Sequence, residues 1–166
     1  MAELSFWVPG IPQPQGSTRA FKRGAKIVTT SANKNLRPWR HMVTLVAQSA
    51  MRESPFQAGL GTAASVEVRV AFAFPRPKSH HGKRGILPSA PTHHVVRPDL
   101  DKLIRAVLDG LTEAAVFGDD SQVVSIVADK VYTPTPPGAR ITVTPMAQPA
   151  VTPPGDSADA ASPRLR

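Results

Sequence analysis

Residues 65–74 read SVEVRVAFAF, and they set the architecture of the chain. Every second side chain is a valine or a phenylalanine, and smaller or charged residues stand between them. Alternation with a period of two predicts a β-strand with one face buried against a core. The fold is therefore expected to include a sheet that contains this strand.

Two amphipathic helices are predicted, one before and one after this strand. The first begins between Asn33 and Pro38 and ends near Glu53, because proline is tolerated only in the first helical turn. The second covers roughly Asp101 to Ala115. Apolar residues recur at spacings of three and four in both segments, which indicates one buried face on each helix. These residues are Trp39, Val43, Val46 and Ala50 in the first helix, and Leu103, Ile104, Val107, Leu108 and Leu111 in the second.

Shorter strands complete the predicted domain. They are expected at residues 4–8, 123–132 and 140–144, and residues 19–30 are expected to form a hairpin that turns near Gly24. This order of elements predicts an α+β fold, a single domain over residues 1–146 with two main helices on a mixed sheet. Residues 147–166 are rich in Pro, Ala and Ser with few large apolar groups, which predicts a disordered tail.

Composition excludes several classes of protein. The 166 residues contain no cysteine, so disulfides, thiolate metal sites and cysteine nucleophiles are ruled out. No apolar run approaches the ~20 residues needed to cross a bilayer, and the first residues lack the features of a signal peptide. We therefore expect a cytoplasmic protein that does not associate with membranes.

Charge is distributed unevenly along the chain. The net charge is +8, but residues 1–98 hold 14 Lys and Arg against 3 acidic residues, whereas residues 99–146 hold 4 against 7. A basic surface attracts phosphates irrespective of sequence. An acidic segment within such a protein is better explained as a cation site than as a DNA contact. The alternative is an ordinary solvated acidic helix.

The basic residues form two groups outside the helices. Arg19, Lys22, Arg23 and Lys26 lie around the predicted hairpin, where they either grip phosphates or merely solubilise a turn. Residues 75–92 combine further cations with prolines and glycines and are expected to form a mobile basic loop. Two histidine pairs, at positions 80–81 and 93–94, are expected to be exposed, since no third ligand stands at a known metal-site spacing.

Four aspartates form the candidate catalytic set. Asp99 and Asp101 precede the second helix, and Asp119 and Asp120 follow it. Residues two apart point to one side in extended backbone but not within a helix, so the first pair is expected at the helix entrance. The structural alternatives are a helix N-cap for the first pair and a turn for the second.

If the chain folds back, Asp120 would complete a cage of three carboxylates with Asp99 and Asp101. Oxygen ligands of this kind suit Mg²⁺ or Mn²⁺, and such a metal can polarise a phosphoryl group and supply hydroxide near neutral pH. Along the helix, Asp101, Arg105 and Asp109 are spaced by four and form a polar stripe, which a solvated ladder of ion pairs would also produce.

This ordered set of motifs resembles the RusA family of Holliday junction resolvases. The matching positions are Asp99-x-Asp101-x-Leu103, then Asp109-Gly110-Leu111, then Asp119-Asp120-x-Gln122-Val123, and finally Lys130. The match is close over residues 97–131 and looser from Leu4 to Thr144.

The resemblance implies a homodimeric, Mg²⁺-dependent endonuclease that nicks four-way DNA junctions symmetrically. Many relatives in this family are encoded by phages or prophages. It implies catalytic metal ligands at Asp99, Asp101 and Asp120, with Asp119 beside them. Lys102 and Lys130 are expected to contact DNA together with the basic hairpin.

Two positions depart from the family pattern. Lys102 stands where the family has asparagine, and Arg105 stands where the family has its catalytic lysine. Arginine can grip a phosphate through two hydrogen bonds, but it does not give up a proton at physiological pH. The preferred hypothesis is a resolvase in which Arg105 acts as a cation. The alternatives are a junction-binding protein with little or no cleavage, and a phosphohydrolase for small nucleotides, which would not need the extended basic surface.

Overall fold

The computed structural model describes residues 2–16, 18–23, 26–31, 33–56, 64–134 and 136–147, and within 18–23 and 26–31 the description covers the backbone. The α+β fold predicted from the sequence is confirmed. Most of the predicted tail lies outside the described residues. In chain order the elements are β1 (Leu4–Pro9), β2 (Thr18–Arg23), β3 (Lys26–Ser31), α1 (Leu36–Glu53), β4 (Ser65–Pro75), a 3₁₀ turn (Lys78–His80), β5 (His81–Gly82), β6 (Gly85–Ile86), α2 (Leu100–Glu113), a second 3₁₀ turn (Asp120–Gln122), β7 (Val123–Thr133) and β8 (Gly138–Met146).

The main sheet is mixed, with the strand order β1-β8-β4-β7. β8 pairs antiparallel with both β1 and β4, whereas β4 and β7 run parallel. The strand read from residues 65–74 is thus central in the sheet, with Val68 opposite both Val143 and Ile126. Its alternation has the expected cause, because Val66, Val68, Val70, Phe72 and Phe74 are all buried.

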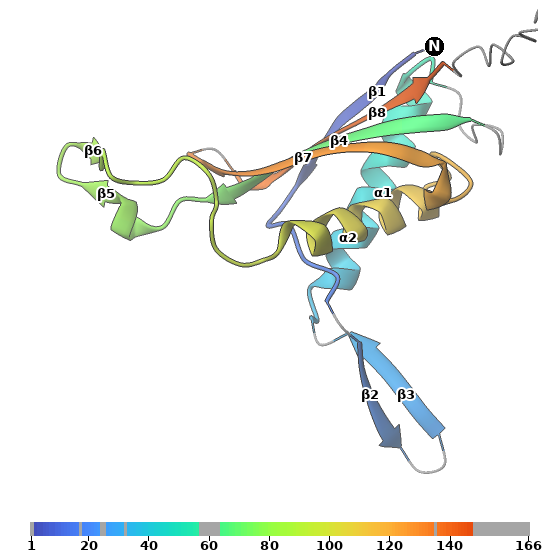
Figure 1. Ribbon diagram of the computed structural model, residues 1–166, viewed down its shortest axis with the longest axis horizontal. Coiled ribbons are helices and arrows are strands. Elements are labelled where there is room, and N and C mark those ends of the chain that lie inside the picture. The colour runs from blue at the N-terminus through green and yellow to red at the C-terminus, as the bar shows by residue number, and fades with distance from the viewer. Residues whose placement is uncertain are drawn as a thin grey trace, which may run out of the picture.

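Both helices cover the same face of this sheet, and the core lies between the two layers (Figure 1). α1 buries Trp39, Val43 and Ala47 toward the sheet, and α2 buries Leu103, Val107 and Leu111. The two helices cross closely at Gly110, where an added Cβ would lie 2.8 Å from Cγ1 of Val43. None of the described helices is long and apolar enough to cross a membrane.

Two hairpins project from this layered body in different directions (Figure 1). One is β2–β3, the predicted basic hairpin, whose register places Arg23 opposite Lys26. The other contains β5 and β6, in which His81 pairs with Ile86. The prediction that residues 75–92 form an irregular loop was therefore incomplete, because they contain a 3₁₀ turn and this short hairpin.

His94 corrects a second expectation. It was expected to be exposed, but its relative exposure is 8%. Its backbone N–H donates to the carbonyl of Lys130 at 2.9 Å, and its ring stacks on Phe74 with 4.1 Å between centroids. The segment around His93 forms an isolated antiparallel bridge with Val131, so it covers the outer edge of β7 at that end. This long-range pairing accounts for the burial.

Candidate active site

Asp99 occupies the entrance of α2 but does not cap it. Its backbone is extended, with φ −70° and ψ 141°, as expected after Pro98. Its side chain makes no capping hydrogen bond and instead accepts from Nζ of Lys102 at 2.6 Å. The alternative that Asp99 is only a helix cap is therefore wrong. Asp101 lies in the first turn of the helix and is exposed.

Cations surround this first carboxylate pair. The hydrogen bond from Lys102 and then its charge, with smaller contributions from Arg97 and Lys130, hold the pKa of Asp99 below its ordinary value. The same hydrogen bond, with attraction from Asp99 and Asp101, raises the pKa of Lys102. Asp99 is thus ionised and Lys102 protonated at neutral pH, in an exposed setting that a phosphate can approach.

Lys130 fixes the segment that leads into α2. It lies on β7 opposite Phe72 of β4, on the face that the helices cover. Its ammonium donates to the carbonyl of Val96 at 2.9 Å and to that of Pro98 at 2.7 Å. In the free protein its immediate role is therefore to position the backbone before Asp99. A contact between Lys130 and DNA remains a prediction.

The second carboxylate pair begins the 3₁₀ turn at the other end of α2. Asp119 accepts a hydrogen bond from the backbone N–H of Ser121 at 2.9 Å, and hydrogen bonds from Ser121 hold the pKa of Asp119 below its ordinary value. The side-chain oxygen of Gln122 accepts from the backbone of Gly118 at 2.8 Å and of Asp119 at 3.2 Å. The alternative that Asp119 stabilises a turn is therefore confirmed as at least part of the role of this residue.

Asp120 is exposed and differs from Asp119 in making none of these cap contacts. It borders a hollow of about 290 Å³ together with Asp119 and three residues of α2, namely Asp109, Thr112 and Glu113. Asp109 is held by Arg40 at 3.3 Å, and Arg40 also pairs with Glu113 at 2.8 Å. Asp109 thus forms its ion pair with Arg40 of α1. The ladder of ion pairs that the spacing of Asp101, Arg105 and Asp109 had suggested along α2 is not formed at Asp109.

Within one protomer the two carboxylate pairs are far apart. They lie at opposite ends of α2, a 14-residue helix whose length is about 21 Å at 1.5 Å per residue. In the described part of the chain, no three Asp, Glu or His side chains are placed to hold one metal ion. A single protomer therefore does not assemble the predicted cage of Asp99, Asp101 and Asp120. Its carboxylates alone do not supply the set of ligands that was expected for a divalent cation.

The remaining predicted site residues differ in how far the structure places them. Arg105 is exposed on α2, and it makes no hydrogen bond or ion pair with the other described residues. Arg19, Lys22, Arg23 and Lys26 belong to the projecting β2–β3 hairpin, but their side chains lie outside the description. Phosphate contacts from these residues remain predictions.

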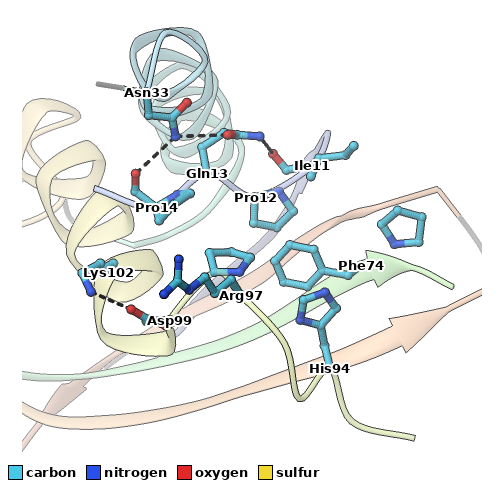
Figure 2. Close-up of a pocket in the computed structure, with 12 residues that line it drawn as sticks. Ile11, Pro12, Gln13, Pro14, Asn33, Phe74, His94, Arg97, Asp99 and Lys102 are labelled. Carbon is cyan, nitrogen blue, oxygen red and sulfur yellow. Dashed lines mark hydrogen bonds and ion pairs between the residues drawn. The ribbon is translucent and has the colours of Figure 1, made fainter. Parts of the chain in front are cut away.

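A larger pocket beside Asp99 was not predicted from the sequence. It measures about 720 Å³ and opens between the loop after β1, the end of β4 and the entrance of α2 (Figure 2). Its lining comes from separate segments spread over residues 11–102, which a single sequence does not connect. The one local signal is the Pro- and Gln-rich composition of residues 9–17, which indicates a loop but not a pocket. The lining residues are Ile11, Pro12, Gln13, Pro14, Asn33, Phe74, Pro75, His94, Arg97, Pro98, Asp99 and Lys102.

Exposed carboxylates interleaved with cations, on a small α+β domain of net charge +8, define a site suited to phosphodiester cleavage. Comparison with known proteins agrees. The family model described as endodeoxyribonuclease RusA matches residues 9–144, so the chain belongs to the RusA endodeoxyribonuclease family. Its sequence is also similar to that of the uncharacterized protein YqaN of Bacillus subtilis (strain 168), with 29% identity over 139 residues, 80% of this chain and 90% of the relative.

The family assignment settles the general class of activity. RusA proteins are Holliday junction resolvases, which are endodeoxyribonucleases that act on branched DNA and depend on divalent metal ions. This chain is accordingly an endodeoxyribonuclease of that class. The hypothesis of a phosphohydrolase for small nucleotides is set aside.

Proposed function

We propose that this protein is a cytoplasmic, Mg²⁺-dependent resolvase that cuts four-way DNA junctions by paired symmetric nicks, as a homodimer whose two protomers share each active site. Mn²⁺ is the expected substitute for Mg²⁺, and the products are expected to carry 5′-phosphate and 3′-hydroxyl ends. The observation that carries the proposal is the placement of the four aspartates at opposite ends of α2, with an open sheet edge between them.

The open edge is the first half of β7. β7 is an edge strand of the sheet, because only β4 pairs with it within the sheet. The segment at His93 and His94 covers the outer edge of its second half. The first half exposes three large apolar side chains, with relative exposures of 61% for Val124, 44% for Ile126 and 48% for Val127. An uncovered strand edge with apolar side chains is a template for pairing with another strand. A second copy of the same edge satisfies this requirement with two-fold symmetry.

The direction of β7 explains why such pairing would join the carboxylates. β7 begins beside Asp120, and further along the strand Lys130 reaches the carbonyl of Pro98 just before α2. Antiparallel pairing of two β7 edges centred near Ile126 would bring the start of one strand to the far end of the other. Asp119 and Asp120 of the partner subunit would then lie near Asp99 and Asp101.

Within this composite site, the cations have distinct proposed roles. Lys102 orients Asp99 through its hydrogen bond, and Lys130 holds the backbone before it. Arg105 lies one helical turn beyond Asp101 with its side chain exposed, so it can bind the scissile phosphate through two hydrogen bonds. The β2–β3 hairpin, with Arg19, Lys22, Arg23 and Lys26, is proposed to hold a DNA arm.

Cleavage of a synthetic four-way junction tests the activity. The protein is incubated with Mg²⁺ and either the junction or a matched linear duplex, with Asp101→Asn alongside. We expect paired symmetric nicks in the junction alone and none with the variant. Junction-selective binding without nicks in any divalent metal would instead support the alternative of a binding protein that has lost cleavage.

Mixing two inactive variants tests the shared site. Asp101→Asn and Asp120→Asn are each expected to be inactive as homodimers. In the mixed dimer, a site shared between protomers leaves one site with both aspartates intact and the other with neither. We therefore expect single, unpaired nicks to reappear after the variants are unfolded and refolded together. If each site lies within one protomer, every site retains a substitution and no cleavage returns.

A further inference from the structure

The pocket beside Asp99 has no role in the metal site proposed above, although Asp99 and Lys102 stand at its rim (Figure 2). Its volume of about 720 Å³ lies within the range of about 300–1,000 Å³ typical of small-molecule pockets. The interior wall is largely apolar, with Pro12, Phe74 and Pro98, and the charged groups lie toward α2. A ligand here would present a flat apolar body inward and an anion outward.

The pocket is held open by hydrogen bonds in its own wall. The amide nitrogen of Asn33 donates to the side-chain oxygen of Gln13 at 3.1 Å and to the carbonyl of Pro14 at 3.3 Å. The amide of Gln13 donates to the carbonyl of Ile11 at 3.0 Å. The next residue in the loop, Gln15, donates its backbone N–H to the carbonyl of Lys102 at 2.9 Å. A preformed wall lowers the entropy lost on binding.

His94 belongs to this apolar wall as a buried ring. Its ring stacks on Phe74 at 26° between planes, and its Nδ1 is buried with no hydrogen-bond partner among the described residues. Burial, and then the charge of Lys130, lower the pKa of His94, so the imidazole is neutral at neutral pH. A neutral ring adds no charge to the wall, so the wall stays suited to an uncharged planar group.

These features match one nucleotide. The largely apolar wall accepts a nucleobase, and Arg97 and Lys102 meet the phosphate. We propose that the pocket takes one base, unstacked from the branch point, of the nucleotide whose phosphate binds beside Asp99. This inference depends on the proposed junction-cleaving function and adds a reason for its selectivity. Extracting a base from intact duplex costs a few kcal/mol, and the cost is smallest where pairing is already lost.

Binding to modified junctions tests the proposal. Each branch-point nucleotide is replaced in turn by an abasic residue, and affinity is measured with EDTA so that no strand is cut. With the native protein we expect one position at which loss of the base weakens binding about tenfold, which corresponds to about 1.4 kcal/mol of lost contact between the base and the pocket. At that same position, 2-aminopurine should gain fluorescence on binding because its neighbours no longer stack on it.

Two variants connect that position to the pocket. Ile11→Trp places bulk at the pocket mouth, and Ile86→Trp is its matched control on the β5–β6 hairpin, since the two isoleucines are 51% and 52% exposed. His94→Leu replaces a planar ring of the wall by an aliphatic side chain and leaves no buried unsatisfied nitrogen, so folding should be preserved. We expect Ile11→Trp and His94→Leu to shrink the effect of the abasic residue to less than threefold, and Ile86→Trp to leave it unchanged.

The outcomes separate this inference from the function on which it depends. A protein that prefers and nicks the junction, but shows no fluorescence gain at any branch position, overturns the pocket proposal alone. Equal sensitivity of all variants to the abasic residue does the same. A protein that binds junction and duplex equally overturns both proposals.

Discussion

At the scale of single residues, the sequence predicted much of the local structure of the aspartates, but it did not predict which residues from other segments surround them. The spacing of Asp99 and Asp101 and the proline before them correctly predicted a position at the entrance of α2 and an extended backbone at Asp99, but Asp101 already lies within the helix, so the expected extended backbone for the pair is wrong at Asp101. Composition also predicted a turn at Asp119, although not that Asp119 caps it. The partners of Lys130 and the burial of His94 depend on segments that meet only in the folded chain.

Replacing Lys130 should impair cleavage more than junction binding. In Lys130→Met, the carbonyls of Val96 and Pro98 lose their charged donor, and the backbone before Asp99 becomes free to shift. Because small displacements of catalytic groups are costly, we expect kcat to fall at least tenfold and the free energy of unfolding to fall by about 1 kcal/mol. Single-turnover cleavage and urea unfolding measure the two effects. Lys78→Met, at the exposed start of the 3₁₀ turn before β5, is the control, and equal losses in both variants would contradict the positioning role.

The pair of Asp99 and Lys102 should appear in the titration of Asp99. Its folded-state pKa is lowered, so the stabilisation from the pair is present above the ordinary carboxyl pKa and is lost as the pH falls through the lowered value. In Lys102→Met the pKa of Asp99 should rise toward the ordinary value near 3.9, because the main cause of the shift is removed. Carboxyl ¹³C chemical shifts followed from pH 2 to 6 measure it. Lys34→Met should leave the titration of Asp99 unchanged. If the pKa of Asp99 were the same in Lys102→Met as in the native protein, the ion pair between Asp99 and Lys102 would be excluded.

At the scale of elements, the close contact of β8 with β1 gives a prediction about Gly138. A Cβ added there would lie 2.5 Å from the carbonyl oxygen of Val8 and would also overlap the indole of Trp7. Because the obstacle includes backbone, Gly138→Ala should lower the free energy of unfolding by about 1–3 kcal/mol. Gly16→Ala meets no atom within 4 Å and should change it by less than about 0.5 kcal/mol. Urea denaturation compares them, and an unchanged midpoint for Gly138→Ala would contradict the packing at this corner.

Periodicity explains which elements the sequence predicted well. β4 and both helices bury one continuous face, so their patterns are long enough to identify, and the structure places them within about two residues of the expected bounds. The β5–β6 hairpin has two residues in each strand and no buried side chain, so it leaves no periodic signal. The pocket beside Asp99 was missed for a related reason, since prolines from three separate segments line it.

At the scale of the whole molecule, the sequence predicted a site that one protomer does not assemble. The motif Asp99-x-Asp101 and the pair Asp119-Asp120 indicate a common metal site only if the chain folds back, but α2 is straight and holds them apart (Figure 1). The resemblance to a dimeric family had implied a second copy. What the structure adds is the open edge of β7 between the two pairs, which offers a physical way for that copy to complete the site.

The dimer should therefore depend on the apolar edge of β7. Ile126→Asp puts a charge where two edges are proposed to meet, and the two charges would face each other across the symmetry axis. We expect the variant to sediment as a monomer, to retain the unfolding temperature of a folded protomer, and to lose junction cleavage by at least a hundredfold. Ile86→Asp is the matched control, because Ile86 is also a half-exposed isoleucine but lies on the β5–β6 hairpin. A folded Ile126→Asp protein that still sediments as a dimer would place the interface elsewhere. If the native protein itself were an active monomer, the aspartates at the two ends of α2 would have to act separately.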